Sequence, residues 1–315
     1  MRFQTFDQLR TQVFQRIQNG EHAAALNLLE DHAGCFPAYD HLTTNWRMCM
    51  LAETGQTERA LAIFKESVDQ GIWWMEPVLR EDPDLASLQG LPEFETLVET
   101  CKVLEQEALN RARPELVVLE PAGDWPRPYP LLVVFHGYAG SAKDTLIEWQ
   151  GLADQGWLVA AIQSSQPVGF NAYAWSDTGR ALADAGQSYQ RLVENYPVDP
   201  QRMVAGGFSQ GGGLAIRMAL QETFPMNGFI AVAPWLAEAE AMGAQLAGPS
   251  PRRSRGYLVL GGQDQGHANF IHIQNLLDAA CISHQAEEHP QAGHVYPPGF
   301  PETINRALAF IFQAG

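Results

Sequence analysis

Cysteine is scarce in this sequence, and its few copies form no recognisable pairs. The 315 residues include four cysteines, at positions 35, 49, 101 and 281, with no Cys-x-x-Cys spacing. That spacing is typical of structural zinc sites, and dense cysteine is typical of disulfide-stapled secreted domains. The sequence therefore predicts neither a zinc site nor a disulfide framework, and we expect the four cysteines to be buried thiols.

Long apolar runs are also missing. Residues Met1 to Asp7 contain no apolar run of signal-peptide length, and no later stretch approaches the ~18 apolar residues of a membrane-spanning helix. We therefore expect a cytoplasmic protein.

Positive charge is the third shortage. Lys and Arg total 20 against 36 Asp and Glu, which gives a net charge of -16. Such a surface repels phosphate backbones and anionic lipid headgroups, so nucleic acid and membranes are not predicted partners. With 46% hydrophobic and 18% charged residues, the composition is that of a folded globular protein, and 315 residues suffice for two domains or one large one.

The first part of the chain contains amphipathic helical patterns and an internal repeat. Shifting this segment by 35 positions pairs Gly20 with Gly55, Ala25 with Ala60, Leu26 with Leu61 and Leu29 with Phe64. Each copy places a small and a large apolar residue on one helical face. The pattern resembles the tetratricopeptide repeat, with Pro37 where that family often has its closing proline. A generic bundle of helical hairpins is the alternative.

The helical region is predicted to end near residue 112. Leu85–Val98 reads as a further helical hairpin with a Gly-Leu-Pro break, which could cap the short array. The first apolar, β-rich stretch begins at Glu115. We therefore predict a tetratricopeptide-like helical domain over residues 1–112 and a second domain over residues 113–315.

The second domain alternates strand-like and helix-like segments. The predicted strands are Leu116–Leu119, Leu131–Phe135, Leu158–Gln163, Met203–Gly206, Phe229–Val232, Tyr257–Leu260 and Gln285–His289. Helical patterns such as Ala181–Asn195 and Ala268–Cys281 separate them. Near-continuous apolar strands alternating with helices predict an α/β fold with a mostly parallel sheet covered by helices.

The sharpest chemical signal is the string Gly-Phe-Ser-Gln-Gly at 207–211, which lies between a predicted strand and a predicted helix. A Gly-x-Ser-x-Gly string in this context predicts a nucleophile elbow, in which a sharp turn presents the serine above the sheet. Ser209 is therefore the predicted nucleophile. The alternative is a glycine-rich turn that only packs helix against sheet.

A serine nucleophile needs a base and a carboxylate that orients this base. Asp264 follows a predicted strand, at the edge where open α/β sheets place their sites, whereas Asp278 lies inside an amphipathic helix. His294 lies in a glycine-containing loop after the last strand, whereas His267 is only three positions from Asp264. We predict Asp264 as the acid and His294 as the base, with His267 as the alternative.

The oxyanion of an acyl-transfer intermediate needs preorganised backbone N–H donors. The N–H of Gln210, directly after the serine, is one predicted donor. The N–H of Tyr138, in the loop after the strand Leu131–Phe135, is the other. His136 in the same loop is predicted to hold the loop by hydrogen bonding and not to act as a catalyst.

These motifs together resemble the phospholipase/carboxylesterase branch of the α/β hydrolases, which is related to the dienelactone hydrolases. The resemblance rests on His136-Gly137, GFSQGG at 207–212, Asp264, His294 and the segment Trp175-Ser176-Asp177. It implies an α/β-hydrolase fold and a serine hydrolase that cleaves carboxylic esters or thioesters through an acyl-enzyme. It implies no metal and no cofactor. Dienelactone hydrolases use a cysteine nucleophile, which Ser209 contradicts.

The substrate is less constrained. Phe170 and Trp175 in the loop Ser164–Trp175, together with Trp235, offer aromatic surface near the expected mouth, and no insertion of lid length is present. We expect a small-molecule ester or thioester to bind there. A serine peptidase is an alternative, as is a scaffold with a vestigial hydrolase whose helical array binds a peptide or protein.

Overall fold

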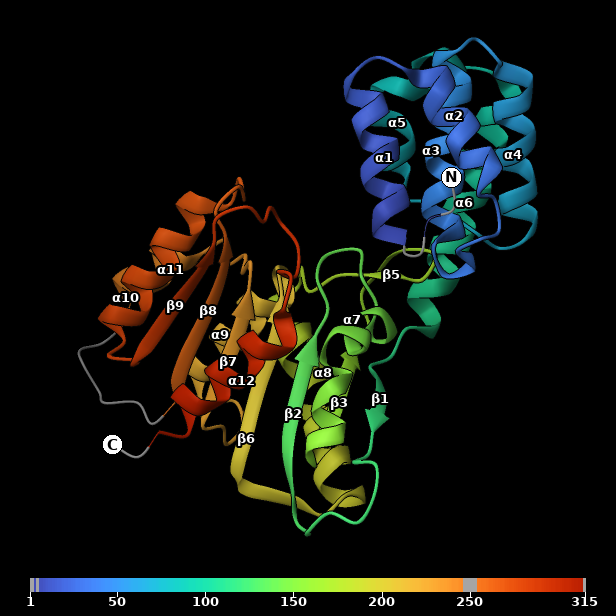
Figure 1. Cartoon of the computed structure of the whole chain (residues 1–315). Coiled ribbons are helices and arrows are strands. Elements are labelled where there is room, and N and C mark those ends of the chain that lie inside the picture. The colour runs from blue at the N-terminus through green and yellow to red at the C-terminus, as the bar shows by residue number, and fades with distance from the viewer. Residues whose placement is uncertain (1–2, 4–5, 246–253, 314–315) are drawn as a thin grey trace. The chain divides into compact units, whose positions relative to one another are not determined.

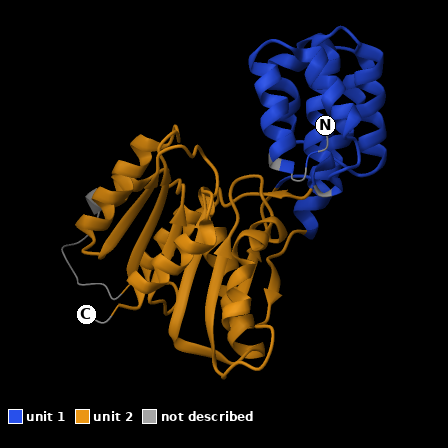
Figure 2. Cartoon of the chain, viewed as in Figure 1, with its two compact units in different colours: residues 1–111, 168–170 blue, residues 112–167, 171–315 orange. Residues whose placement is uncertain are grey.

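The computed structural model describes residue 3 and residues 6–245 and 254–313. The chain forms two compact units (Figures 1 and 2). Unit 1 comprises residues 1–111 and 168–170, and unit 2 comprises residues 112–167 and 171–315. Unit 1 thus includes the short segment Val168–Phe170, which comes from the middle of the second part of the chain.

Unit 1 is all-α among its described N-terminal residues. Its helices are α1 (Phe6–Gln18), α2 (His22–Asp31), α3 (Asp40–Glu53), α4 (Thr57–Asp69), α5 (Glu76–Glu81) and α6 (Pro92–Arg111), with 3₁₀ turns η1 (Pro37–Tyr39) and η2 (Pro83–Leu88). The predicted hairpin over Leu85–Val98 is half right. Its second arm is α6, but its first arm is the 3₁₀ turn η2, which Pro83 begins and Asp82 caps by accepting a hydrogen bond from the N–H of Asp84.

The internal repeat is visible as two successive helical hairpins, α1 with α2 and α3 with α4. Gly20 and Gly55 follow the first helix of each pair with φ of 75° and 73°, a backbone conformation that glycine adopts without steric cost. Ala25 and Ala60 are fully buried at equivalent places. The repeat therefore sets the packing of helices against each other, and the all-α unit is consistent with a tetratricopeptide-like array.

Unit 2 is built on a seven-stranded sheet in the order β1-β3-β2-β6-β7-β8-β9. The strands are β1 (Glu115–Leu119), β2 (Tyr129–Phe135), β3 (Leu158–Gln163), β6 (Val198–Phe208), β7 (Gly228–Val232), β8 (Arg255–Gly261) and β9 (His284–His289). All neighbours pair in parallel except β1, which runs antiparallel to β3. The predicted mostly parallel sheet is confirmed.

Helices cover the sheet on both faces (Figure 1). They are α7 (Ala142–Trp149), α8 (Thr178–Asn195), α9 (Gln210–Gln221), α10 (Ala239–Gln245), α11 (His267–Ala279) and α12 (Phe300–Ile311), with a 3₁₀ turn η3 (Gln150–Gln155). Strand β2 explains the two layers. Leu131 and Val133 belong to one hydrophobic cluster and Leu132 and Val134 to another, because successive side chains of a strand point to opposite faces. A second, two-stranded sheet pairs β4 (Pro167–Gly169) with β5 (Ala172–Tyr173).

The cysteine expectation is half right. Cys49 and Cys101 are buried, but Cys35 and Cys281 are exposed, and all four are free thiols. Both exposed cysteines lie in connecting segments, Cys35 between α2 and η1 and Cys281 between α11 and β9. In the described part of the chain no helix has the length and apolar character needed to cross a bilayer.

Glycines allow helix α9 to begin directly against the end of the sheet. A Cβ atom added to Gly211 would lie 2.2 Å from the carbonyl oxygen of Phe135 and 2.5 Å from that of His136. A Cβ on Gly207 would lie 2.4 Å from the carbonyl carbon of Gly211. Because these neighbours are backbone atoms of buried elements, they cannot move aside cheaply.

We therefore expect Gly211→Ala to destabilise the protein by about 2 kcal/mol or more, as overpacking against fixed neighbours does. Gly186→Ala is the matched control, since a Cβ at this position of α8 would meet nothing within 4 Å. It should stabilise the protein by roughly 0.5–1 kcal/mol through helix propensity. Urea unfolding of both variants measures the two free energies, and equal effects of the same sign would contradict the packing account.

Candidate active site

Ser209 lies between the end of β6 and the start of α9, with φ of 52° and ψ of -119°. A residue with a side chain rarely adopts a positive φ, so the surrounding structure must hold it there. Three hydrogen bonds do so. The N–H of Ser209 donates to the carbonyl of Val232 at 2.9 Å, and the carbonyl of Ser209 accepts from the N–H of Gly213 at 3.0 Å and of Trp235 at 2.9 Å.

His294 lies in the loop between β9 and α12, and its imidazole bridges Ser209 and Asp264. Its Nε2 is 2.9 Å from the Ser209 Oγ, and its Nδ1 is 2.8 Å from the Asp264 Oδ2. Because a carboxylate only accepts hydrogen bonds, the proton of the neutral imidazole belongs on Nδ1, which leaves Nε2 as an acceptor facing the serine hydroxyl.

Asp264 follows β8 and is held from two sides. The Asp264 side chain is 6% exposed, whereas the His294 side chain is 45% exposed, so the carboxylate is fixed inside the protein while the imidazole faces solvent. Asp264 Oδ1 accepts a hydrogen bond from the N–H of Gly266 at 2.8 Å, which leaves Oδ2 directed at the histidine.

The alternatives from the sequence lie elsewhere. His267 is the exposed first residue of α11, and Asp278 is 74% exposed on the same helix, beside His284. Among the hydrogen bonds and ion pairs of the described residues, neither side chain contacts Ser209 or His294. The arrangement brings together the three residues that the sequence order selected.

The loop after β2 passes beside Ser209. A Cβ atom added to Gly137 would lie 3.0 Å from the Phe208 Cδ1 and 3.4 Å from the Ser209 Cβ, so the loop passes within contact distance of the serine. A turn closed by the N–H of Gly140 and the carbonyl of Gly137, at 3.1 Å, places Tyr138 at its second position. The N–H of that position is not part of the turn's hydrogen bond. Gln210 begins α9, where first-turn N–H groups have no partner within the helix.

His136 supports this loop, as the sequence predicted. It is fully buried, its Nδ1 is 2.8 Å from the Gly137 carbonyl, and its Nε2 faces the N–H of Ser164 at 3.3 Å and the Gln163 amide nitrogen at 3.2 Å. Burial lowers the pKa of His136 to about 4, because the charged form loses its hydration. The imidazole is therefore neutral at physiological pH, donating through Nδ1 and accepting through Nε2.

The three predicted substrate-binding aromatics have different surroundings. Trp175 is buried, and its indole N–H donates to the carbonyl of His136 at 2.9 Å while its backbone N–H donates to the Gln210 side chain at 2.8 Å. Trp235 is 48% exposed. Phe170 is grouped with unit 1, where its N–H donates to the carbonyl of Trp73 at 3.2 Å and its ring packs against the helical core.

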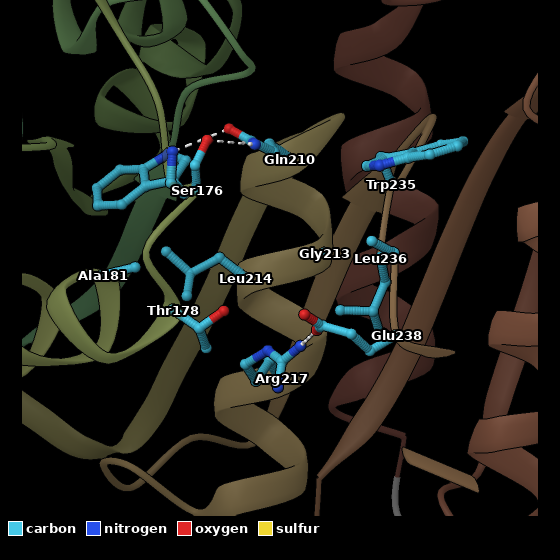
Figure 3. Close-up of a pocket in the computed structure, with 12 residues that line it drawn as sticks. Ser176, Thr178, Ala181, Gln210, Gly213, Leu214, Arg217, Trp235, Leu236 and Glu238 are labelled. Carbon is cyan, nitrogen blue, oxygen red and sulfur yellow. Dashed lines mark hydrogen bonds and ion pairs between the residues drawn. The ribbon is translucent and has the colours of Figure 1, made fainter. Parts of the chain in front are cut away.

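A pocket beside Gln210 contains residues that the sequence analysis did not select (Figure 3). Trp175 and Trp235 line it, together with Leu214, Arg217, Leu236 and Glu238. The sequence did contain a pattern that points to the lining residues from α9. Gln210, Gly213, Leu214 and Arg217 have the i, i+3, i+4, i+7 spacing of one helical face that begins directly after Ser209.

Two family models match this chain. Residues 159–295 match the phospholipase/carboxylesterase family, and residues 5–109 match the N-terminal domain of A/B hydrolase-like proteins. The search of curated proteins found no match. The first part of the chain is therefore similar to the N-terminal domain of A/B hydrolase-like proteins and the later part to the phospholipase/carboxylesterase family, and hydrolase chemistry is supported at the level of the family.

Solved structures show the same fold. An uncharacterized protein from Bacillus cereus ATCC 10987 is 25% identical, with a TM-score of 0.54 over 98% of this chain and 99% of that chain, so the similarity includes both units. Esterase PE8 is 18% identical, with a TM-score of 0.53 over 64% of this chain and 100% of its own. The Bacillus cereus carboxylesterase is 16% identical, with a TM-score of 0.50 over 66% and 99% of the two chains.

The buried His136 predicts a pH-dependent stability. The pKa of a histidine in the unfolded chain is ~6.5, whereas that of His136 in the folded protein is about 4. Between these two pH values the unfolded chain binds a proton at this residue and the folded protein does not. The free energy of unfolding therefore keeps its full contribution from His136 above pH ~6.5. It falls as the pH is lowered, by about 2 kcal/mol at pH 5 from this residue alone. Urea unfolding at pH 7 and pH 5 should show a smaller loss for His136→Gln, which cannot take up a proton. An equal loss in both proteins would contradict the assignment.

Proposed function

We propose that this protein is a serine esterase that hydrolyses small carboxylic esters or thioesters through an acyl-enzyme on Ser209. The observation that carries the proposal is the continuous hydrogen-bonded chain from Ser209 Oγ through His294 to Asp264, with distances of 2.9 and 2.8 Å. A positioned base and its orienting carboxylate are what a serine hydroxyl needs to become a nucleophile at neutral pH.

In the first half of the reaction, Ser209 Oγ attacks the carbonyl carbon of the ester while His294 Nε2 takes the hydroxyl proton. The resulting oxyanion accepts hydrogen bonds from the N–H groups of Tyr138 and Gln210. When the intermediate collapses, the C–O bond to the alcohol breaks and His294 returns its proton to the leaving oxygen. The products are the free alcohol and an ester of Ser209.

In the second half, a water molecule repeats the attack. His294 takes a proton from the water as its oxygen adds to the acyl carbon, and the same two N–H groups receive the oxyanion. The bond to Ser209 Oγ then breaks, His294 protonates this oxygen, and the carboxylic acid leaves. Asp264 stays ionised throughout and stabilises the imidazolium that forms twice in each cycle.

The exposure of the site supports small soluble substrates. The His294 side chain is 45% exposed, so solvent water reaches the proposed base. Hydrolysis by solvent water therefore follows acylation directly, which favours hydrolysis over transfer of the acyl group to another acceptor.

Removing the nucleophile gives the first functional test. Ser209→Ala should lower kcat/KM for p-nitrophenyl acetate by a factor of about 10⁴ or more, because the covalent route is lost. Ser283→Ala, at an exposed serine between α11 and β9, is the matched control and should leave kcat/KM unchanged. Full activity of the Ser209→Ala protein would refute the proposal.

Removing the base gives the second. His294→Ala should reduce kcat/KM about as strongly as Ser209→Ala, since members of one catalytic unit are not additive. The double variant should be no slower than either single variant. His267→Ala removes an exposed imidazole three positions from Asp264 and should behave like the wild-type protein. If His267→Ala were inactive and His294→Ala active, the base would have to be reassigned.

A further inference from the structure

The pocket of Figure 3, here called the α9 pocket, starts at Gln210, the residue directly after Ser209, and ends at the ion pair between Arg217 and Glu238. Its volume is about 100 Å³. Figure 3 shows Gln210 and Trp235 at one end, Leu214 and Leu236 facing each other in the middle, and Arg217 with Glu238 at the other end. The remaining lining residues are Trp175, Ser176, Thr178, Ala181, Gly213 and Ala237.

One face of α9 forms the length of the pocket. Gln210 and Arg217 are seven positions apart on α9, so they are separated by ~10 Å along the helix axis at 1.5 Å per residue. Gly213 lets the opposite wall approach, because a Cβ there would lie 2.0 Å from the Trp235 carbonyl oxygen. That wall is fixed further by Leu236, whose N–H and carbonyl both bond to the Asn269 amide at 2.9 and 2.8 Å. The pocket is thus narrow and rigid.

Its middle is apolar and its end is charged. Leu214, Leu236 and Ala181 are 5%, 4% and 1% exposed. Arg217 closes the end with an ion pair to Glu238, and the Arg217 side chain is 12% exposed against 58% for Glu238. The guanidinium therefore lies largely inside the protein, and the Glu238 carboxylate balances its charge from the solvent side. A methylene group that displaced this carboxylate would leave the buried charge of Arg217 unpaired.

The position of the pocket relative to His294 decides which half of an ester it can hold. His294 must reach the leaving oxygen to protonate it, so the alcohol lies on the side of the His294 loop. None of the residues that line the pocket comes from that loop, and Gln210, a predicted oxyanion donor, is among them. Since the acyl group of an ester extends from the carbonyl carbon away from the leaving oxygen, a pocket that no residue of the His294 loop lines is placed to hold the acyl group and not the alcohol.

We infer that the α9 pocket binds the acyl group of the substrate and that the Arg217–Glu238 ion pair limits its length, which makes the protein selective for esters of short aliphatic acids. This inference rests on the proposed function, because it assigns one half of the ester substrate. Each methylene that enters the apolar part should raise kcat/KM about fourfold, as burial of a methylene does. The gain ends where the chain reaches the ion pair.

A series of p-nitrophenyl acetate, butyrate, hexanoate, octanoate and decanoate tests this in the full-length protein. In the wild-type protein kcat/KM should peak at butyrate or hexanoate and fall at octanoate. Arg217→Met replaces the charged end with an apolar, flexible side chain and should raise the octanoate-to-butyrate ratio of kcat/KM at least tenfold. Glu238→Gln, at a mostly exposed position that tolerates substitution, should raise the same ratio less, because it only weakens the closing pair.

Lys65→Met is the matched control. It removes one cation from the exposed Lys65–Asp69 ion pair of α4 in unit 1 and should leave the ratio unchanged. A ratio within twofold of wild type in both Arg217→Met and Glu238→Gln would overturn the inference, as would a wild-type optimum at decanoate.

A binding measurement separates this inference from the proposed function. Calorimetry on Ser209→Ala protein should detect binding of butyrate at concentrations where octanoate does not bind. The double variant Ser209→Ala/Arg217→Met should bind octanoate. If the wild-type protein hydrolysed no ester while this length limit was found, the pocket assignment would stand and the esterase proposal would fall. If esters were hydrolysed but binding showed no dependence on length or on Arg217, the pocket assignment would fall alone.

Discussion

The backbone conformation of Ser209 is the constraint on which the rest of the site depends. A positive φ at a residue with a side chain costs of order 1–3 kcal/mol, which the fold must supply from elsewhere. It does so through three backbone hydrogen bonds to Ser209 and through glycines on both sides that let α9 begin against the sheet. The same geometry puts the first N–H groups of α9 next to the serine, so one strained turn positions both Ser209, the proposed nucleophile, and the Gln210 N–H, a proposed donor for the oxyanion.

Two histidines near this turn differ in their environments, and the difference fits a structural role for His136 and the proposed role of a base for His294. His136 is fully buried, and its pKa is lowered to about 4, so it stays neutral and holds the loop that touches Ser209. His294 is 45% exposed, and its Nδ1 is 2.8 Å from the Asp264 carboxylate, as the proposed role of a general base requires. The histidine that holds the loop in place is thus the one that solvent does not reach.

Much of this could be predicted from the sequence, for reasons that particular residues illustrate. The sheet strands follow from apolar runs such as Leu131–Phe135, which are buried on both faces and so lack polar interruptions. The order of Ser209, Asp264 and His294 along the chain, each after a strand, led to three residues that are within hydrogen-bonding distance. Pairings that depend on tertiary structure alone were not predictable. Arg217 and Glu238 are 21 positions apart with no local pattern to connect them, and Phe170 packs on helices that lie far from it in sequence.

The most direct test of the account is the site and rate of reaction with a fluorophosphonate, which phosphorylates an activated serine and needs no knowledge of the substrate. Peptide mapping of the labelled full-length protein should find a single adduct, on Ser209, and labelling should slow by several orders of magnitude in His294→Ala protein, because the base no longer activates the hydroxyl. Labelling of another serine, or equal rates with and without His294, would contradict the claim that this strained turn presents an activated nucleophile.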